Sequence, residues 1–299
     1  MRNGTRGTVS PAPHFWMKIF LFVFCLVYCT GAVGEIYFDL PSDDWYKRPL
    51  IRLTAFDTAQ SDCMLLECGG EAMMIDGGTG QFREMLRDEI TARGISHFKY
   101  LLNTHFHEDH ITGLTWLMHY GFGVGEYLHP YHESGVRVSI RHAEAIKEAQ
   151  KQNIPIRQVF HGDTLMLGEA VVSITRYDDG ASTNGRSLVI RVDFGDASML
   201  LPADIIGHTQ TWLVQNFGTD LLDVDILKAP HHGITAMVPK FLEAASPLAL
   251  LMNNDYDRVD KGRTQAESYG IPTYYSGEGR VVFESDGDDW YVYQLEGHF

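Results

Sequence analysis

The amino-acid sequence predicts an α+β protein in which two β-sheets pack face to face and helices cover their outer sides, within a single domain. Two observations favour this fold class. From Ile51 onward, short runs of β-forming residues alternate with runs of helical periodicity. The second half of the chain then repeats the order of the first, with strands followed by helices and no linker between the halves. Each sheet must bury one face, so two such sheets are expected to cover each other.

The first half is expected to open with a three-stranded meander. Apolar and β-branched runs bounded by turn residues predict its strands, and the two glycines at 69–70 form one of its turns. The strands of this half are expected at 51–56, 62–68, 71–75 and 98–103, and its helices at 80–94, 112–120 and 134–151. Cys63 and Cys68 point to opposite faces of one strand, which predicts two free thiols.

The second half continues with elements of the same two kinds. Its strands are expected at 170–177, 187–194, 197–201, 224–228, 248–252, 272–275, 280–285 and 289–295, and its helices at 206–216, 237–245 and 261–269. The last three strands are expected to close the fold. The sequence shows no low-complexity run or short-period repeat, which favours one domain over a repeat architecture.

The first 34 residues stand apart from this pattern. They contain three basic residues, an apolar run at 19–29 and small residues at 30–34, in that order. This order is typical of a secretory signal, and the apolar run is shorter than the roughly 20 residues that span a bilayer. We therefore expect residues 1–34 to be a signal peptide and residues 35–299 to be the folded domain of a secreted protein. A short, uncleaved membrane anchor is the alternative.

Charge narrows the range of partners. The 299-residue chain has a net charge of −15, and loss of residues 1–34 removes three basic residues and no acid, which leaves −18. An acidic surface repels polyanions, so a small or short anionic substrate is expected and long duplex nucleic acid is not. A membrane contact is expected only through the N-terminal segment, if that segment is retained.

The stretch "THFHEDH" at 104–110 follows a predicted strand and carries four residues of metal-ligand type. Zinc and similar cations take imidazole and carboxylate ligands at about 2.0–2.2 Å. In a turn that leaves a strand, His105 and His107 can point at one ion. Once the chain enters a helix, Asp109 and His110 can point at a neighbouring position, so the motif predicts a binuclear site. A histidine-rich solvated turn is the alternative.

Two later strand ends offer further ligands. The run "SMLLPADI" ends an apolar strand on Asp204, whose carboxylate can bridge two cations, and "ILKAPHHG" ends another on His231 and His232. Taken alone, Asp204 is typical of a helix N-cap and the two histidines of a surface turn. Together with the first motif they complete one site. The sequence leaves open which of His231 and His232 faces the metal.

These motifs, in this order, resemble the metallo-β-lactamase superfamily, whose HxHxDH motif corresponds to residues 105–110 and whose bridging aspartate corresponds to Asp204. The chain is more similar still to the metallo-hydrolase domain of competence-type DNA-uptake proteins and their secreted relatives. That likeness lies in "FDTAQSDCMLLEC", "MMIDGG", "NGRSLV" and "LKAPHHG". The resemblance implies a four-layer αββα sandwich of the metallo-β-lactamase type, with a hydrolytic site at the strand ends between the sheets.

The resemblance also implies a divalent metal cofactor, zinc in the first place and manganese as the alternative, with one or two ions. Many relatives carry a further first-site histidine in a "GHT" turn, and this chain has "DDGASTNGRS" in that region. The first site therefore has only His105 and His107 before Asp204. This leaves the second site, which includes Asp109 and His110, better supplied with ligands.

Such a site predicts hydrolysis. Two cations can hold a bridging water, lower its pKa toward neutrality and polarise the scissile bond, so no nucleophilic side chain is required. The leading hypothesis is an exported hydrolase that uses a metal-bound hydroxide on phosphodiester-type bonds, either nuclease-like or a small phosphodiesterase. The alternatives are a lactone, lactam or thioester hydrolase of the same fold, and a metal-binding protein without catalysis.

Several side chains have roles in this hypothesis. Asp109 is expected to orient the water or accept its proton, and Asp76 to form hydrogen bonds behind the metal ligands. Asn184, Ser187 and Lys228 are expected near the mouth of the site, where they could contact an anionic substrate. Seven other histidines are expected to have surface or structural roles: His97, His119, His129, His132, His142, His161 and His208.

Overall fold

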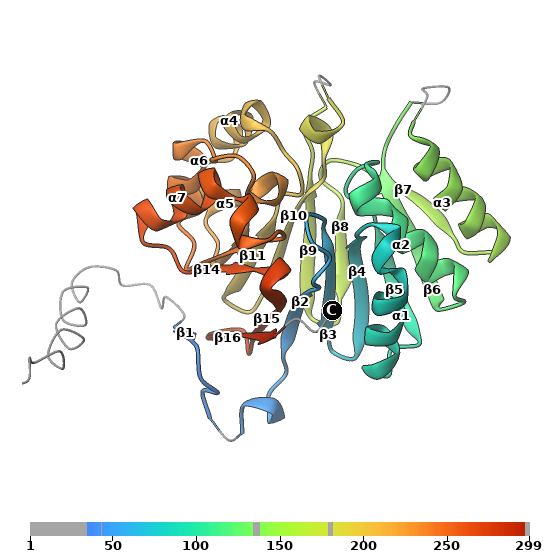
Figure 1. Cartoon of the computed structure of the whole chain (residues 1–299), viewed down its shortest axis with the longest axis horizontal. Helices are drawn as coiled ribbons and strands as arrows, with labels where there is room; N and C mark the ends of the chain where they lie inside the picture. Colours follow the sequence, from blue (N-terminus) through green and yellow to red (C-terminus); the bar gives the residue numbers. More distant parts are fainter. Residues whose placement is uncertain (1–34, 43, 134–137, 179–181, 297–299) are drawn as a thin grey trace, which may run out of the picture. The chain divides into compact units, whose positions relative to one another are not determined.

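Two β-sheets pack face to face in the computed structural model, which describes residues 35–42, 44–133, 138–178 and 182–296 (Figure 1). Within these residues, one sheet has nine strands in the order β1-β16-β15-β2-β3-β4-β5-β6-β7, and the other has seven in the order β14-β13-β12-β11-β10-β9-β8. The strands of the first sheet are β1 (Ile36–Tyr37), β2 (Ile51–Ala55), β3 (Cys63–Cys68), β4 (Glu71–Gly77), β5 (His97–Leu102), β6 (Gly123–Pro130), β7 (Ile156–Val159), β15 (Gly279–Ser285) and β16 (Trp290–Glu296). The strands of the second sheet are β8 (Thr164–Leu167), β9 (Ala170–Thr175), β10 (Val189–Phe194), β11 (Ala197–Leu201), β12 (Ile226–Lys228), β13 (Ala249–Met252) and β14 (Thr273–Tyr275).

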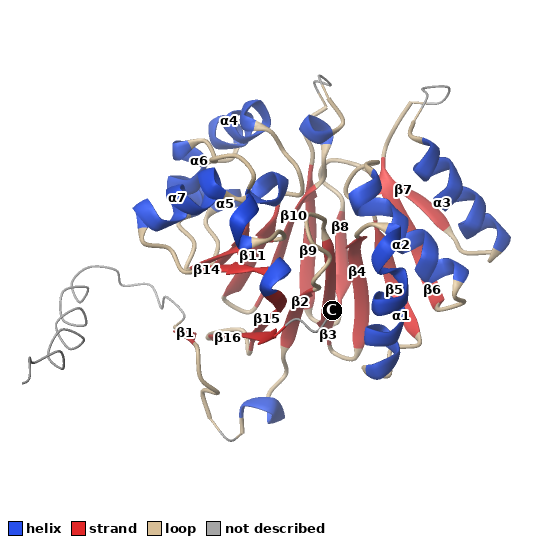
Figure 2. Ribbon diagram, viewed as in Figure 1, coloured by secondary structure: helices blue, strands red, loops and turns tan. Residues whose placement is uncertain are grey.

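Helices cover the outer face of each sheet (Figure 2). The α-helices of the described residues are α1 (Arg83–Ala92), α2 (Glu108–His119), α3 (Ile140–Lys151), α4 (Gly207–Asn216), α5 (Thr219–Leu222), α6 (Pro239–Ala245) and α7 (Asp260–Tyr269). Strand periodicity separates the layers. Along β3, Met64 and Leu66 join the core between the sheets, whereas Leu65 joins the core beneath α1, α2 and α3. A third apolar core lies between the second sheet and the helices from α4 to α7.

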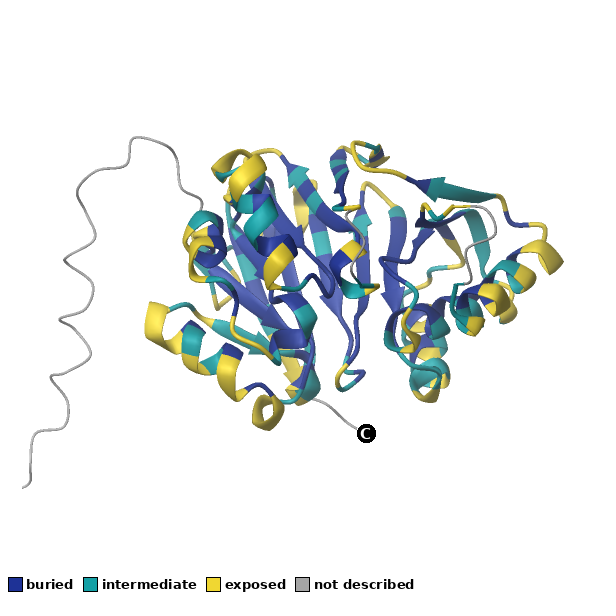
Figure 3. Ribbon diagram, turned by 90° about the horizontal axis from the view of Figure 1, so that it is seen from above, coloured by how far each residue is buried: buried dark blue, intermediate teal, exposed yellow. Residues whose placement is uncertain are grey.

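This arrangement confirms the predicted α+β fold class, a four-layer αββα sandwich. Figure 3 shows burial concentrated in the two sheets and exposure on the outer helices. Cys63 and Cys68 are free, as predicted, and both are buried. None of the helices in the described part of the chain has the length and apolar character needed to cross a bilayer. The secretory segment predicted at 1–34 lies outside the described residues.

The predicted elements differ from the structure mainly between residues 103 and 170. Strands β6, β7 and β8 were not predicted, and α3 begins at Ile140 instead of 134. Glycines 123 and 125 made β6 resemble a loop. In the structure they allow close pairing with β5, because a Cβ at Gly125 would crowd the Lys99 carbonyl oxygen. Helix α2 begins at Glu108 instead of 112, since two acids in its first turn suit the positive end of the helix dipole.

The direction of the strands determines where the site lies. Strands β4, β5 and β6 run parallel to one another in the first sheet, as do β11, β12 and β13 in the second. Residues that follow parallel strands therefore emerge at one edge of each sheet, where ligands bind in open α/β sheets. The motif at 104–110 follows β5, Asp204 follows β11, and the pair at 231–232 follows β12.

The C-terminal hairpin completes the first sheet. Strand β15 pairs antiparallel with β2, placing Phe283 opposite Leu53. Strand β16 pairs with β15 and, in parallel, with β1, where Ile36 lies opposite Trp290. The hairpin therefore lies between the two N-terminal strands of the described chain.

Two glycines bring α2 against the end of β4. A Cβ at Gly113 would overlap the Gly77 carbonyl group, and a Cβ at Gly77 would overlap the backbone of 113–114. The backbone N–H of Gly113 also donates to the Gly78 carbonyl oxygen at 3.1 Å. This close approach positions the start of α2, and with it the turn that carries the predicted ligands.

We predict that Gly113→Ala destabilises the protein by about 1–3 kcal/mol, because the added methyl group must push α2 away from β4. Urea unfolding measures this change. The matched control is Gly207→Ala, also in a helix, where the new Cβ would meet only Val238 at an ordinary 3.5 Å. Equal stability of the two variants would contradict the close-contact argument.

Candidate metal centre

Asp76 organises the turn that follows β5. It is the buried, last but one residue of β4 and has a left-handed backbone (φ 53°). Its Oδ1 accepts hydrogen bonds from the Thr104 backbone N–H at 2.8 Å and from Asn103 Nδ2 at 3.1 Å, and its Oδ2 accepts one from His110 Nδ1 at 2.7 Å. This last bond leaves His110 Nε2 pointing to the other side of the ring. Asp76 thus lies behind a predicted ligand, where an orienting carboxylate belongs.

Two groups of ligand-type side chains share Asp204. In one group, His105, His107 and Asp204 each place one ligand atom within 4.8 Å of the others. In the other, His110 Nε2 lies 3.4 Å from Asp204 Oδ2, and His232 Nε2 lies 3.4 Å from Asp204 Oδ1. Asp204 is almost fully buried between the groups. This is the bridging position expected of its carboxylate in a binuclear site.

Two further aspartates approach the second group from opposite sides. Asp109 Oδ2 lies 3.4 Å from His232 Nε2, and its Oδ1 lies 4.0 Å from His110 Nε2. Asp62 also falls within 4.8 Å of this group, but its Oδ1 faces His232 Nδ1 at 3.1 Å and accepts from Asn253 Nδ2 at 3.0 Å. Since the Nε2 atoms face Asp204, Asp109 is the ligand candidate and Asp62 orients His232 from behind.

The structure distinguishes the two neighbouring histidines. Pro230–Gly233 forms a short turn in which His231 and His232 both adopt left-handed backbone conformations (φ 51° and 55°). The His231 backbone N–H donates to the Ala203 carbonyl oxygen at 3.0 Å, which ties the turn to the end of β11. His232 is fully buried in the second group, while the His231 side chain is 33% exposed, with Nε2 3.9 Å from Asp204 Oδ2. His232 is therefore the better-placed ligand.

Lys228 does not lie at the mouth of the site, and its expected position is corrected. Its side chain is fully buried at the end of β12. The ammonium lies 2.6 Å from Asp62 Oδ2 and 3.7 Å from Asp204 Oδ1, and it donates to the Ala203 carbonyl oxygen at 2.9 Å. Buried charges require partners of this kind. Lys228 therefore holds two carboxylates of the centre together.

Asn184 is the first residue of the short 3₁₀-helix Asn184–Arg186, and Ser187 directly follows that helix. Ser187 is fully buried, so the expectation that it lies at the mouth is also corrected. Asn184 Oδ1 and Ser187 Oγ are both buried without a hydrogen-bond partner among the described residues. The next residue, Leu188, donates its backbone N–H to the Thr104 carbonyl oxygen at 3.0 Å, which places this segment beside the ligand turn.

A pocket of about 340 Å³ opens beside the first ligand group. Its lining includes His105, Phe106 and His107, and also Arg176 and Arg186. His107 is exposed, whereas His105 is buried. The sequence reasoning gave neither arginine a role, although Arg186 lies within the "NGRSLV" motif. Cationic groups thus share a pocket with the ligand turn.

The charged groups of the centre shift one another's pKa values. Burial alone would raise the pKa of Asp204, but the charges on His110 and His232 hold it well below its usual range. Conversely, burial opposes protonation of His232, and the carboxylates of Asp204 and Asp62 raise its pKa to about 10. The pKa of His110 is raised well above its usual value against burial by Asp204 and Asp76.

The residues fit divalent cations. The Nε2 atoms of His105, His110 and His232 are buried and lack hydrogen-bond partners in the described part of the chain. All three lie within 3.8 Å of a carboxylate oxygen of Asp204. Buried imidazole nitrogens that converge on a carboxylate are the ligand set that zinc and related ions take.

The chain is similar in sequence to known proteins. Residues 57–246 match a family model described as the metallo-beta-lactamase superfamily. ComE operon protein 3 of Bacillus subtilis (strain 168) is 24% identical over 181 residues, which cover 56% of this chain and 22% of that protein. The chain therefore aligns with about a fifth of this curated relative.

Solved structures give the same fold. CmlA, a diiron β-hydroxylase from Streptomyces venezuelae, superposes with a TM-score of 0.54 at 14% identity, covering 82% of this chain and 54% of that one. The metallo-beta-lactamase fold protein YhfI from Bacillus subtilis gives a TM-score of 0.52 at 12% identity, covering 80% of this chain and 100% of that one. At these identities the likeness shows the fold alone.

We predict that Lys228→Met lowers the free energy of unfolding of the metal-free protein by about 3–5 kcal/mol, because Asp62 and Asp204 lose the cation between them. Chemical unfolding in the presence of a chelator measures this loss. Lys151→Met is the control, since its side chain is 58% exposed and its ion pair with Glu148 should contribute at most about 1 kcal/mol. Similar losses in the two variants would contradict the assigned role of Lys228.

We predict that metal binding at this centre releases protons. The raised pKa values keep His110 and His232 protonated at neutral pH in the metal-free protein, and a cation must displace those protons. Metal affinity should therefore rise with pH, with about two protons released per centre at pH 7. Calorimetric titration in buffers of different ionisation enthalpy measures this number.

The raised histidine pKa values also determine how the stability of the metal-free protein changes with pH. A raised histidine pKa stabilises the fold fully below the unfolded value of about 6.5, and this contribution is lost as the pH rises toward 10. A metal affinity independent of pH would show that these imidazoles are not ligands.

Proposed function

Because the chain belongs to the metallo-β-lactamase superfamily, we propose that it is an exported, metal-dependent hydrolase of phosphodiester-type bonds in a small or short anionic substrate. The family likeness predicted from the motifs is confirmed, and the fold carries clusters of metal-ligand residues. The bond type, the identity of the ion and export are proposals.

One observation carries the choice of bond: the pocket brings Arg176 and Arg186 to the space that His105 and His107 also line. Arg176 is almost buried, and it donates from Nη1 to the Tyr131 carbonyl oxygen at 2.7 Å and from Nε to the Arg186 carbonyl oxygen at 3.0 Å. Its guanidinium is therefore held in place, while Arg186 is exposed. Guanidinium groups match phosphate oxygens, and a neutral lactam or lactone needs no such pair.

Asp109 and His107 have separate roles in the proposed reaction. A divalent cation bound here supplies Lewis-acid and water-activating chemistry. Asp109 is 31% exposed at its side chain, whereas the carboxylates of Asp62 and Asp204 are buried. Asp109 is thus the carboxylate of the centre that can reach a substrate and take up a proton. His107, exposed at the start of α2, presents the first ligand group to the pocket.

Zinc is the proposed ion, with manganese as the alternative, because the ligands are imidazoles and carboxylates. Export is proposed on the order of basic, apolar and small residues within 1–34. A membrane contact is proposed only through that segment, if it is retained. The net charge of −15 supports a short substrate over long duplex nucleic acid.

We predict turnover of bis-p-nitrophenyl phosphate and short single-stranded oligonucleotides by protein loaded with zinc or manganese, and little turnover of nitrocefin, a simple lactone or long duplex DNA. Initial rates across this panel measure the preference. His107→Ala should lower the rate by at least about tenfold, because it removes an exposed ligand of the first group. Turnover of a lactone or lactam without turnover of a diester would contradict the proposed bond type. Metal binding without any turnover would indicate a metal-binding protein without catalysis.

Arg186→Gln tests the part of the proposal that rests on the pocket. It should raise KM for the diester by about tenfold with a smaller change in kcat, as expected for loss of a contact made equally in the ground and transition states. Arg87→Gln, on the exposed side of α1, is the matched control and should change neither constant. An unchanged KM in Arg186→Gln would show that Arg186 does not bind the phosphate group of the substrate.

A further inference from the structure

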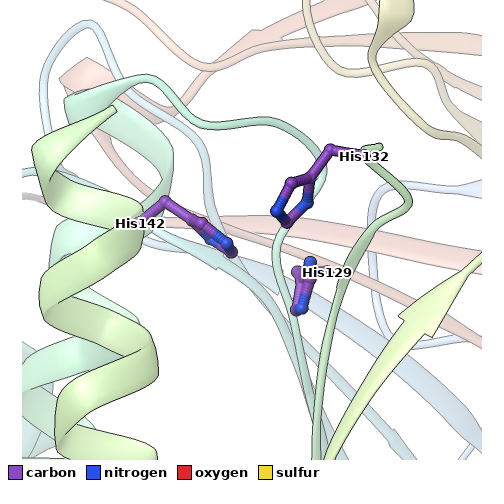
Figure 4. Close-up of side chains that lie close together, drawn as sticks. All are labelled: His129, His132 and His142. Atoms are coloured by element: carbon purple, nitrogen blue, oxygen red, sulfur yellow. The ribbon is translucent and has the colours of Figure 1, made fainter. Parts of the chain in front are cut away.

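Three histidines outside the metal centre, His129, His132 and His142, lie close together (Figure 4). His129 comes from the end of β6, His132 from the loop that follows, and His142 from the first turn of α3. One ring nitrogen of each lies within 4.8 Å of the others. The ring centroids are 4.6–5.5 Å apart. The sequence predicts only surface or structural roles for these histidines, because nothing in their spacing links them.

The cluster is buried and short of partners. His129 and His142 are each only 3% exposed, and His132 is half-buried. Nδ1 of His132 and Nδ1 of His142 are buried without a hydrogen-bond partner among the described residues. A buried nitrogen without a hydrogen-bond partner lowers the stability of a fold by about 1–3 kcal/mol. Two such nitrogens in one cluster therefore favour a bound ligand.

The third ring is already oriented. His129 Nδ1 donates to the Pro130 carbonyl oxygen at 3.0 Å, which leaves the lone pair on Nε2. Backbone carbonyls orient metal-binding histidines in this way. Burial also lowers the pKa of His129 to about 4 and that of His142 to about 3, so both rings are neutral and keep a lone pair at neutral pH.

Phe106 separates this cluster from the metal centre. Its ring centroid lies 4.3 Å from that of His142 and 5.7 Å from that of His132. Its chain neighbours His105 and His107 belong to the ligand group that contains Asp204. The cluster therefore packs behind the turn whose other side carries the centre. His132 also lines the same pocket as His105 and His107.

We propose that His129, His132 and His142 form a separate binding site for a transition-metal dication such as zinc, with three imidazole ligands and one open position. Three nitrogens on a tetrahedral zinc lie about 3.3 Å apart, so the rings must draw together when the ion binds. His132, on a half-buried loop, is free to make most of that movement. An all-imidazole set favours zinc, copper or nickel over magnesium or calcium.

A metal at this place would cross-link β6, the following loop and α3 around Phe106. It would also add positive charge to the wall of the pocket, because its imidazole ligands are neutral. The inference does not depend on the proposed hydrolase function, since it concerns residues outside the groups around Asp204.

The test is the number of zinc ions bound by the full-length chain. Wild-type protein, His132→Ala and His142→Ala are equilibrated with excess Zn²⁺, freed of unbound metal by gel filtration and analysed for zinc per chain. Each variant should hold one ion fewer than wild type. His119→Ala is the control, because His119 is exposed on α2, lies 3.5 Å from Glu148 and belongs to none of the groups of ligand-type residues, so it should match wild type. His132→Ala removes a half-buried loop side chain, and circular dichroism verifies its fold.

A second readout separates the two sites. Co²⁺ in place of zinc should give visible absorption bands. One part of their intensity should disappear in His132→Ala, and a different part, from the first ligand group around Asp204, should disappear in His107→Ala. Equal zinc content and equal cobalt spectra in wild type and both cluster variants would overturn the inference. If wild type binds a single ion and both cluster variants lose it, the inference holds and the proposed hydrolase centre fails. If only His107→Ala loses metal, the inference fails and the centre stands.

Discussion

The metal centre depends on one buried ammonium group. Lys228 lies between Asp62 and Asp204, two carboxylates that would otherwise repel each other in a crevice closed to water. Asp204 belongs to both ligand groups, and Asp62 faces Nδ1 of His232. The geometry of both groups therefore depends on the ion pairs that Lys228 forms with these two carboxylates. A charge at this depth is stable only with its partners, which makes the ends of β11 and β12 interdependent.

Each buried ring of the second group has a carboxylate behind it. Asp76 faces Nδ1 of His110 and Asp62 faces Nδ1 of His232, while both Nε2 atoms turn toward Asp204. In the first group, no carboxylate of the described residues is hydrogen-bonded to His105 Nδ1, whose partner there is the Thr104 hydroxyl at 3.2 Å. The two groups should therefore differ in ligand basicity, and the second is the more strongly organised.

The sequence predicted those parts of the fold and site that have a local signature. The residues at 105–110 form a compact motif, and Asp204 and the pair at 231–232 each follow an apolar strand, so the pattern made them candidates. The choice of His232 over His231 needed the burial that only the structure gives. The burial of Lys228 could not be predicted, because its partner Asp62 lies 166 residues earlier in the chain. The cluster at 129, 132 and 142 could not be predicted for a similar reason. Its rings meet only because the end of β6, the loop that follows and the first turn of α3 come together in the fold, and β6 contains glycines that are typical of a loop.

The position of the C-terminal hairpin affects how the chain reaches this state. Strand β2 pairs on one side with β15, which lies more than 200 residues later in the chain. Within the described residues, β1 pairs with β16 alone. One edge of the first sheet thus stays open until the last residues of the domain have been made. Pairings across so much of the chain slow folding and expose strand edges meanwhile. A chain that stops before Gly279 would present β2 as an unpaired strand edge, the kind of edge on which other strands can pair and aggregate.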